Sequence, residues 1–150
     1  MEIWTVGYEK AALADVLRSL RYAGVECLVD VRELPQSRRA GFSKRMLQAS
    51  VEELGIDYRH LKALGTPKEG RVAHHSGDQA RFWAVYEKQL ATSEAQQALD
   101  ELTELAGRRR ACLLCFEADW RHCHRARIVE VLGERAPVEA HHLLPEPAFL

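Results

Sequence analysis

A repeated order of elements constrains the fold of this chain more than any other feature: a short apolar run, an amphipathic stretch and then a glycine. Residues 3–6 form a β-favouring run that ends at Gly7. Apolar residues then recur at helical spacing, at Leu13, Val16, Leu17 and Leu20. Gly24 follows where a left-handed helix cap is expected, and residues 25–31 are typical of a buried strand. This segment therefore predicts a strand, a helix and a second strand.

The same order recurs along the rest of the chain. Helices are predicted over residues 43–54, from Ser93 onward and over residues 123–132, and they are closed by Gly55, Gly107 and Gly133. Ser93 and Gln96 form a capping-box pattern at the start of the second of these helices. Strands are predicted at residues 56–60, 111–116 and 138–143. One more helix, packed in the core, is indicated by Phe82, Trp83, Tyr86 and Leu90.

Strands that alternate with helices indicate a mainly parallel sheet, because parallel strands need crossover connections. We therefore predict an α/β fold, a three-layer sandwich with a mainly parallel sheet of about five strands and helices on both faces. The chain has 150 residues, the usual size of one domain, so residues 1–150 are expected to form a single α/β domain. Residues 33–42 and 65–78 lie outside the pattern as long polar connections, and such loops are often functional.

Composition narrows the class of protein. With 47% hydrophobic and 29% charged residues, the chain has enough apolar surface to fold, which excludes a disordered protein. The 21 basic and 22 acidic residues nearly cancel, so no overall field marks a nucleic-acid or membrane-surface protein. Charges such as Glu2, Asp15 and Arg18 interrupt any leader or membrane span near the start. We expect a cytoplasmic protein with no membrane partner and reduced thiols, although a disulfide from Cys27 stays open.

Polar side chains gather just after the predicted strands, where open parallel sheets bind their ligands. The candidates are Tyr8 after the first strand, Asp30, Arg32, Ser37 and Arg38 after the second, His60 after the third, and Glu117, Cys123, His124 and Arg125 after the fourth. Because parallel strands present their carboxyl ends at one edge, we expect the residues after the second and fourth strands to surround one cleft. The adjacent pairs His74-His75 and His141-His142 are weak candidates, since neighbouring side chains point in different directions.

An arginine-rich segment follows the second predicted strand. Residues 32–45 contain five basic residues and one acidic residue, Glu33. A guanidinium is a planar fork of donors that suits phosphate or carboxylate, so Arg32, Arg38 and Arg39 could form an anion clamp. The alternative is a solvated loop in which Arg32 pairs with Asp30.

Residues 115–125 form the densest group of chemically active side chains. If a helix begins near Cys123, the thiol lies at the positive end of the helix dipole, which favours a thiolate and attracts anions. Three interpretations are open: a phosphate-binding helix start, a thiolate nucleophile, and a metal site. The metal site would use Cys115, Glu117, Cys123 and His124. Because the seven residues between the two cysteines do not match a familiar zinc-knuckle spacing, we predict no metal.

Several short motifs occur in order along nearly the whole chain. They are Thr5-Val-Gly-Tyr8, Asp30-Val-Arg32 with Pro35, Ser37 and Arg38, Leu64-Gly65, Cys115-Phe-Glu117 and Cys123-His-Arg125. Through these motifs the sequence resembles the DUF488 family of bacterial and archaeal proteins. The resemblance implies a cytoplasmic α/β domain with a polar cleft built from the motifs, and it implies no particular reaction or cofactor.

Our leading hypothesis is an enzyme that acts in this cleft on a phosphate-bearing or other anionic substrate, related to nucleotides or nucleic acids. Asp30, Glu117 and His124 are the acid–base candidates. Substrate binding is expected from Tyr8, Arg32, Ser37, Arg38, His60 and Arg125. The alternatives are a nucleotide- or nucleic-acid-binding module without turnover, and a thiol-dependent enzyme that uses Cys123. The sequence leaves the cofactor, the substrate and the oligomeric state open.

Overall fold

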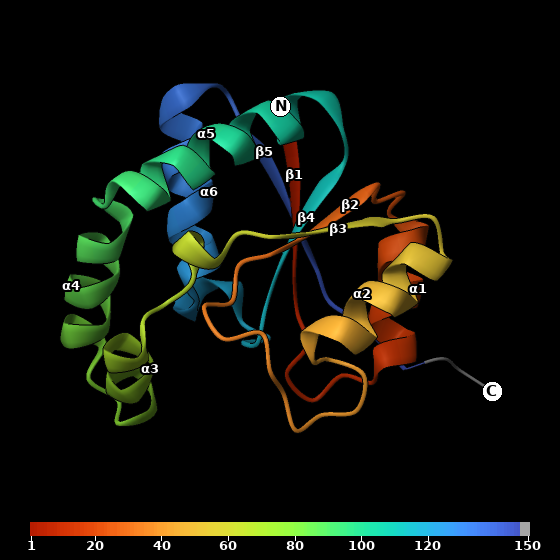
Figure 1. Cartoon of the computed structure of the whole chain (residues 1–150), viewed down its shortest axis with the longest axis horizontal. Helices are drawn as coiled ribbons and strands as arrows, with labels where there is room; N and C mark the ends of the chain where they lie inside the picture. The colour runs from red at the N-terminus through yellow and green to blue at the C-terminus, as the bar shows by residue number, and fades with distance from the viewer. Residues whose placement is uncertain (148–150) are drawn as a thin grey trace.

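The computed structural model describes residues 1–147, which form a parallel sheet covered by helices on both faces (Figure 1). The strands are β1 (Glu2–Gly7), β2 (Cys27–Asp30), β3 (Asp57–His60), β4 (Ala111–Cys115) and β5 (Glu139–Leu143). Their order in the sheet is β3-β2-β4-β1-β5, and each neighbouring pair is parallel. The predicted three-layer α/β fold with five parallel strands is therefore confirmed.

The helices divide between the two faces of the sheet. They are α1 (Leu13–Tyr22), α2 (Lys44–Glu53), α3 (Lys68–His75), α4 (Gln79–Leu90), α5 (Ser93–Arg108) and α6 (His124–Arg135), with single 3-10 turns at η1 (Lys62–Leu64) and η2 (Trp120–His122). The buried side chains of α1 and α2 pack on one face, and those of α4, α5 and α6 pack on the other. Within residues 1–147, no helix combines the length and the apolar character needed to cross a bilayer.

Alternation along β4 decides which face each cysteine of that strand meets. Successive side chains of a strand point to opposite faces of the sheet. Cys115 accordingly belongs to the core under α5 and α6, together with Leu113. Cys112 belongs to the core under α1 and α2. Cys115 therefore faces the start of α6, whereas Cys112 is separated from it by the sheet.

One predicted connection contains a helix. Residues 65–78 were expected to form a long polar loop, and this prediction was wrong because α3 occupies most of the segment. The helix has only eight residues and a short apolar face, so its periodicity is weak in the sequence. It is held by packing against α4, which Gly70 permits: an added Cβ there would lie 2.6 Å from the Thr66 methyl group and 3.2 Å from Val85.

Two of the four predicted glycine caps are present. Gly24 and Gly55 have positive φ values of 72° and 78° directly after α1 and α2, as the pattern predicts. Gly107 and Gly133 lie inside α5 and α6, so the prediction that they close these helices was wrong. Both helices pass straight into extended backbone, which requires no left-handed residue.

The start of α5 is displaced by one residue from the predicted capping box. Thr92 is the N-cap, and its hydroxyl accepts a hydrogen bond from the backbone N–H of Ala95 at 3.2 Å. The Gln96 side chain donates to the carbonyl of Leu90 at 2.7 Å instead of closing a box with Ser93. Threonine and serine both cap helices, and the chain direction out of α4 decides between these neighbours.

Candidate functional site

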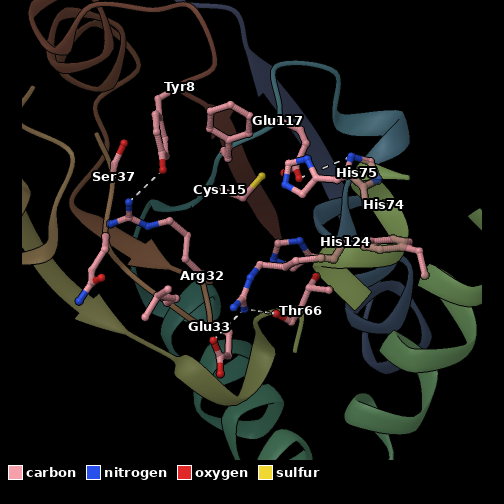
Figure 2. A pocket seen from close by; sticks show the side chains of 15 residues that line it. Tyr8, Arg32, Glu33, Ser37, Thr66, His74, His75, Cys115, Glu117 and His124 are labelled. Atoms are coloured by element: carbon pink, nitrogen blue, oxygen red, sulfur yellow. Dashed lines mark hydrogen bonds and ion pairs between the residues drawn. The ribbon is translucent and has the colours of Figure 1, made fainter. Parts of the chain in front are cut away.

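A pocket of about 310 Å³ opens at the carboxyl edge of the sheet (Figure 2). Its walls come from the ends of β1 and β4, from the segment after β2, and from α3, α4 and the start of α6. The lining combines the apolar Tyr8, Leu34, Phe82 and Phe116 with the polar or reactive Arg32, Glu33, Gln36, Ser37, Thr66, Arg71, His74, His75, Cys115, Glu117 and His124. An apolar body with a few convergent polar groups is the usual character of a small-molecule site.

The arginine wall is built on a buried ion pair. Arg32 donates from Nε and Nη2 to the two carboxylate oxygens of Asp30 at 2.9 and 2.8 Å. Its Nη1 donates to the carbonyl of Phe42 at 2.7 Å and to the hydroxyl of Tyr8 at 3.1 Å. Tyr58 donates a further hydrogen bond of 2.5 Å to Asp30. These contacts fix the Arg32 side chain and partly neutralise it before any ligand arrives.

Thr66 contributes a hydroxyl without a partner. Its side chain is buried and lines the pocket, and Oγ1 has no hydrogen-bond partner among the residues that the structure describes. The Thr66 carbonyl accepts a hydrogen bond of 2.8 Å from Arg71, which also pairs with Glu33 at 2.8 Å. A buried unpaired hydroxyl costs about 1–3 kcal/mol. A polar ligand atom in the pocket would remove that cost.

Glu117 and His74 approach each other from different elements. Glu117 follows β4, His74 lies in the last turn of α3, and their Oε1 and Nε2 atoms are 3.8 Å apart. Burial and the neighbouring Cys123 thiolate, against the opposing effect of His124, together raise the pKa of Glu117 to about 7. The Glu117 carboxyl can therefore exist in either protonation state near neutral pH.

Two cysteines meet where β4 ends and α6 begins. The Cys115 and Cys123 sulfurs are 2.7 Å apart, and His124 Nδ1 lies 3.6 Å from the Cys123 sulfur. His124 Nε2 donates to the carbonyl of Val31 at 2.7 Å. Arg125 directs its backbone N–H and its Nε–H at the Cys123 sulfur, at 3.5 and 3.4 Å. All four cysteines are free and buried.

These contacts separate the acidities of the two thiols. Burial raises the pKa of Cys115, and its hydrogen bond to Cys123 raises it further. Burial also opposes ionisation of Cys123, but the hydrogen bond from Cys115 and the charges of His124 and Arg125 outweigh it and hold the pKa of Cys123 well below its usual value. Burial disfavours the charged form of His124, yet the Cys123 thiolate raises the pKa of the imidazole above its usual value. Of the two thiols, Cys123 is therefore the one that forms the thiolate.

Arg125 ties the site to the sheet. It donates to the Thr5 hydroxyl at 3.1 Å and to the backbone carbonyl of Glu117 at 2.5 Å. The same carbonyl lies against Gly7, where an added Cβ would come within 1.7 Å of its oxygen. Only glycine allows β1 to pass this close to the segment that carries Glu117.

The structure distributes the sequence-predicted candidates among three environments. Tyr8, Arg32, Ser37, Glu117 and His124 line the pocket. Asp30, Cys123 and Arg125 are buried behind this lining, in contact with its members. His60 and Arg38 lie away from it: His60 Nε2 donates to the Arg32 carbonyl at 2.7 Å, and Arg38 lines a separate surface depression with Arg39.

Sequence reasoning missed Thr66 and Arg71 in the wall that comes from α3 and the turn before it, and it treated His74 and His75 only as weak candidates. Thr66, Arg71, His74 and His75 all line the pocket. The residues after each strand gave no clue to them, because this wall does not follow a strand. The available signal was the unusual length of the connection at residues 65–78, since long connections are where function concentrates.

Fold and site together define a class: a parallel α/β protein with a small, partly apolar pocket at the carboxyl edge of its sheet and a thiol–imidazole–carboxyl cluster at that pocket's inner end. Comparison with protein families matches residues 12–132 to the domain of unknown function DUF488. The chain therefore belongs to the DUF488 family. Comparisons with curated proteins and with solved structures gave no match.

Proposed function

We propose that the protein is an enzyme that acts on a small phosphate-bearing or otherwise anionic molecule of nucleotide size, bound in the pocket at the carboxyl edge of the sheet. The observation that carries the proposal is the buried, unpaired Thr66 hydroxyl in the same pocket as Cys115, Glu117 and His124. A polar group left without a partner in a pocket lined by reactive side chains favours a site that is completed by a substrate.

The wall around Thr66 suits an anion with an aromatic body. Arg71, His74 and His75 supply cationic or hydrogen-bonding groups on one side of the pocket. Tyr8, Phe82 and Phe116 supply aromatic surface on which a planar ring can pack. The volume of about 310 Å³ accommodates a small molecule and not a duplex, which favours a nucleotide-sized substrate over nucleic acid.

The reacting end of the pocket is the cluster at β4 and α6. Cys115, Glu117 and His124 line the pocket, and Cys123 lies directly behind Cys115. A thiol-dependent enzyme is the second candidate function, supported by the two N–H groups of Arg125 that point at the Cys123 sulfur. In that case the sulfur that meets the substrate is Cys115, because Cys123 does not line the pocket, and the hydrogen-bonded Cys123 thiolate would take the Cys115 proton.

Binding is tested with nucleoside 5′-monophosphates and with the matching nucleosides as neutral controls. We expect the monophosphates to raise the melting temperature and the nucleosides to have much smaller effects. Thr66→Val and His74→Ala should each weaken binding severalfold. Thr103→Val and Arg45→Ala are matched controls, because Thr103 bonds to Leu99 on α5 and Arg45 is exposed on α2. The proposal fails if no monophosphate binds, or if the controls weaken binding as much as the pocket variants do.

Turnover is tested separately with Glu117→Gln. Incubation of bound monophosphates with the wild-type protein, followed by phosphorus and proton NMR, should reveal a product, and Glu117→Gln should bind but lose most of the turnover. If the wild-type protein and the variant both bind the monophosphates and leave every one of them unchanged, the protein is a binding module and not an enzyme.

A further inference from the structure

We propose that Cys115, Cys123, His124 and Glu117 form a binding site for one zinc ion at the inner end of the pocket. Each residue offers one ligand atom, and these four atoms lie within 4.8 Å of one another. Two thiolates, an imidazole and a carboxylate form a donor set that selects zinc over magnesium or calcium, which prefer oxygen ligands.

The distances between the donors suit one tetrahedral ion with a small adjustment. Zinc bond lengths of about 2.3 Å to sulfur and about 2.0 Å to nitrogen place two sulfurs about 3.8 Å apart and a sulfur and nitrogen about 3.5 Å apart. The Cys123 sulfur and His124 Nδ1 are 3.6 Å apart. The distance between the two sulfurs is 2.7 Å, which is longer than a disulfide bond of about 2.05 Å. The sulfurs would move apart by about 1 Å to bind the ion.

The second nitrogen of His124 provides independent support. A backbone carbonyl can only accept, so His124 Nε2 carries the proton that it donates to Val31 at 2.7 Å. In the neutral ring this leaves Nδ1, which faces Cys123, with a free lone pair for a metal. Zinc-binding histidines regularly use their other ring nitrogen in this way, and the hydrogen bond fixes both the tautomer and the ring orientation.

Burial and charge also favour an ion here. The Cys115 and Cys123 side chains are each only 1% exposed, and the Glu117 carboxylate lies beside them. A divalent cation at this point would balance the negative charge that two thiolates and a carboxylate bring when they bind it. Arg125 points two N–H groups at the Cys123 sulfur and donates its other hydrogen bonds to Thr5 and to the Glu117 carbonyl. It therefore stabilises negative charge on one of the two sulfurs only.

The spacing of Cys115 and Cys123 in the sequence led us to predict no metal, and the fold explains why that spacing is unfamiliar. In a zinc knuckle, paired cysteines come from one tight turn. Here Cys115 ends a strand, whereas Cys123 and His124 begin a helix, and η2 spans part of the distance between them. Tertiary packing of α6 on β4 brings the two halves together, so no fixed local spacing is required.

The ion would be reached from the pocket. Cys115, Glu117 and His124 all line it, so a bound zinc would stand next to any molecule in the cavity. The catalytic value of the metal rests on the proposed function, whereas metal binding itself does not. Two exposed glutamates, Glu2 and Glu139, and the half-buried His141 form a second cluster without thiols, which any test must distinguish from this one.

The test begins with untagged protein purified under reducing conditions from zinc-supplemented medium. Mass spectrometry of the metal content should find about one zinc per chain. Replacement of the zinc by cobalt should give thiolate-to-cobalt charge-transfer bands, which the thiol-free surface cluster cannot produce. Cys115→Ala and Cys123→Ala should each retain less than about a tenth of the zinc. Cys112→Ala is the matched control, since Cys112 lies on the same strand but faces the opposite core, and it should keep its zinc.

Circular dichroism checks that each variant is folded, and the cobalt spectrum of the wild-type protein tests the site even if a variant unfolds. A folded, reduced wild-type protein that binds neither zinc nor cobalt overturns the proposal. Metal uptake without charge-transfer bands, or a metal-free protein that retains a Cys115–Cys123 disulfide under reduction, overturns it equally. Monophosphate binding is measured on zinc-loaded and on zinc-stripped protein, which separates the two proposals. Zinc can bind to a protein that binds no monophosphate, and a monophosphate can bind to a protein that binds no zinc.

Discussion

Arg32 and Asp30 form a buried ion pair with two parallel hydrogen bonds, of 2.9 and 2.8 Å, although only one residue separates them in the chain. The remaining Arg32 donors hold Tyr8 and the carbonyl of Phe42. One guanidinium thus links the ends of two strands to the segment that follows β2. Arg32 pairs with Asp30 as the alternative from the sequence expected, but the pair is buried instead of solvated, and it gives Arg32 a structural role at the wall of the pocket.

Removing the acid of this pair should destabilise the protein strongly. Asp30→Asn leaves Arg32 charged and unpaired in a site where it is only 6% exposed, and breaking such a buried pair costs roughly 3–5 kcal/mol. Asp57→Asn, which removes an exposed pair with Arg109, should cost less than about 1 kcal/mol. Urea unfolding of the two variants provides the comparison, and equal losses would contradict a structural role for the Asp30 pair.

Gly7 should tolerate no side chain. In Gly7→Ala the new Cβ would meet the Glu117 carbonyl at 1.7 Å and Arg125 Nη2 at 2.9 Å, so the segment bearing Glu117 must move. We expect a loss of at least about 1–3 kcal/mol. Gly133→Ala, in the interior of α6 with no described atom within 4 Å of its added Cβ, should instead gain about 0.5–1 kcal/mol. Thermal unfolding distinguishes the two, and a stable Gly7→Ala protein would show that the close approach is dispensable.

His142 should make stability fall with acidification. Burial, together with the charges of Arg125 and Arg121, lowers the pKa of His142 to about 4, and the ring accepts a hydrogen bond from Thr5. The unfolded chain, with a His142 pKa near 6.5, therefore binds the proton first. Stability from this group is complete above about pH 6.5 and is lost as the pH falls toward 4. Unfolding curves of His142→Gln should show a shallower decline over this window, and parallel curves for both proteins would rule the group out.

Thr66→Val should separate ligand binding from stability. The substitution removes a buried hydroxyl that has no partner among residues 1–147 and keeps nearly the same shape. Losing the desolvation cost should leave stability unchanged or raise it by up to about 1–2 kcal/mol, even as monophosphate binding weakens. Chemical denaturation measures the first quantity and calorimetric titration the second. A clear loss of stability would mean that the hydroxyl is satisfied within the free protein.

Alkylation should find the Cys115 and Cys123 pair before the other thiols. Cys115 lines the pocket, and Cys123 holds the low-pKa thiol in contact with it. Burial raises the pKa of Cys112 and of Cys27, so neither thiol is reactive. Peptide mapping after brief iodoacetamide treatment of metal-free protein should show modification of the pair first, and added zinc should suppress it. Early labelling of Cys27 or Cys112 would contradict this order.

The local pattern of the sequence determined the strands, most of the helices and the fold class. Periodicity placed every strand within two residues, because burial on one or two faces leaves a repeat that depends only on neighbouring residues. The same reasoning placed the start of a helix near Cys123, and in the structure Cys123 is the N-cap of α6, where its side chain accepts a hydrogen bond from the Arg125 N–H. Parallel strands with helical crossovers then implied that residues after β2 and β4 share one edge.

Only the tertiary structure decided which of those residues meet. The sulfur of Cys115 reaches Cys123 because alternation along β4 turns it toward α6, and because α6 packs on that face of the sheet. Arg38 lines a different depression, whereas Thr66 and His74 line the pocket. The course of the connecting segments decides this, and those segments have no periodic pattern in the sequence. The chemical character of each side chain can be read directly from the sequence. The distances between segments depend on how the layers pack, and that packing involves residues far apart in the chain.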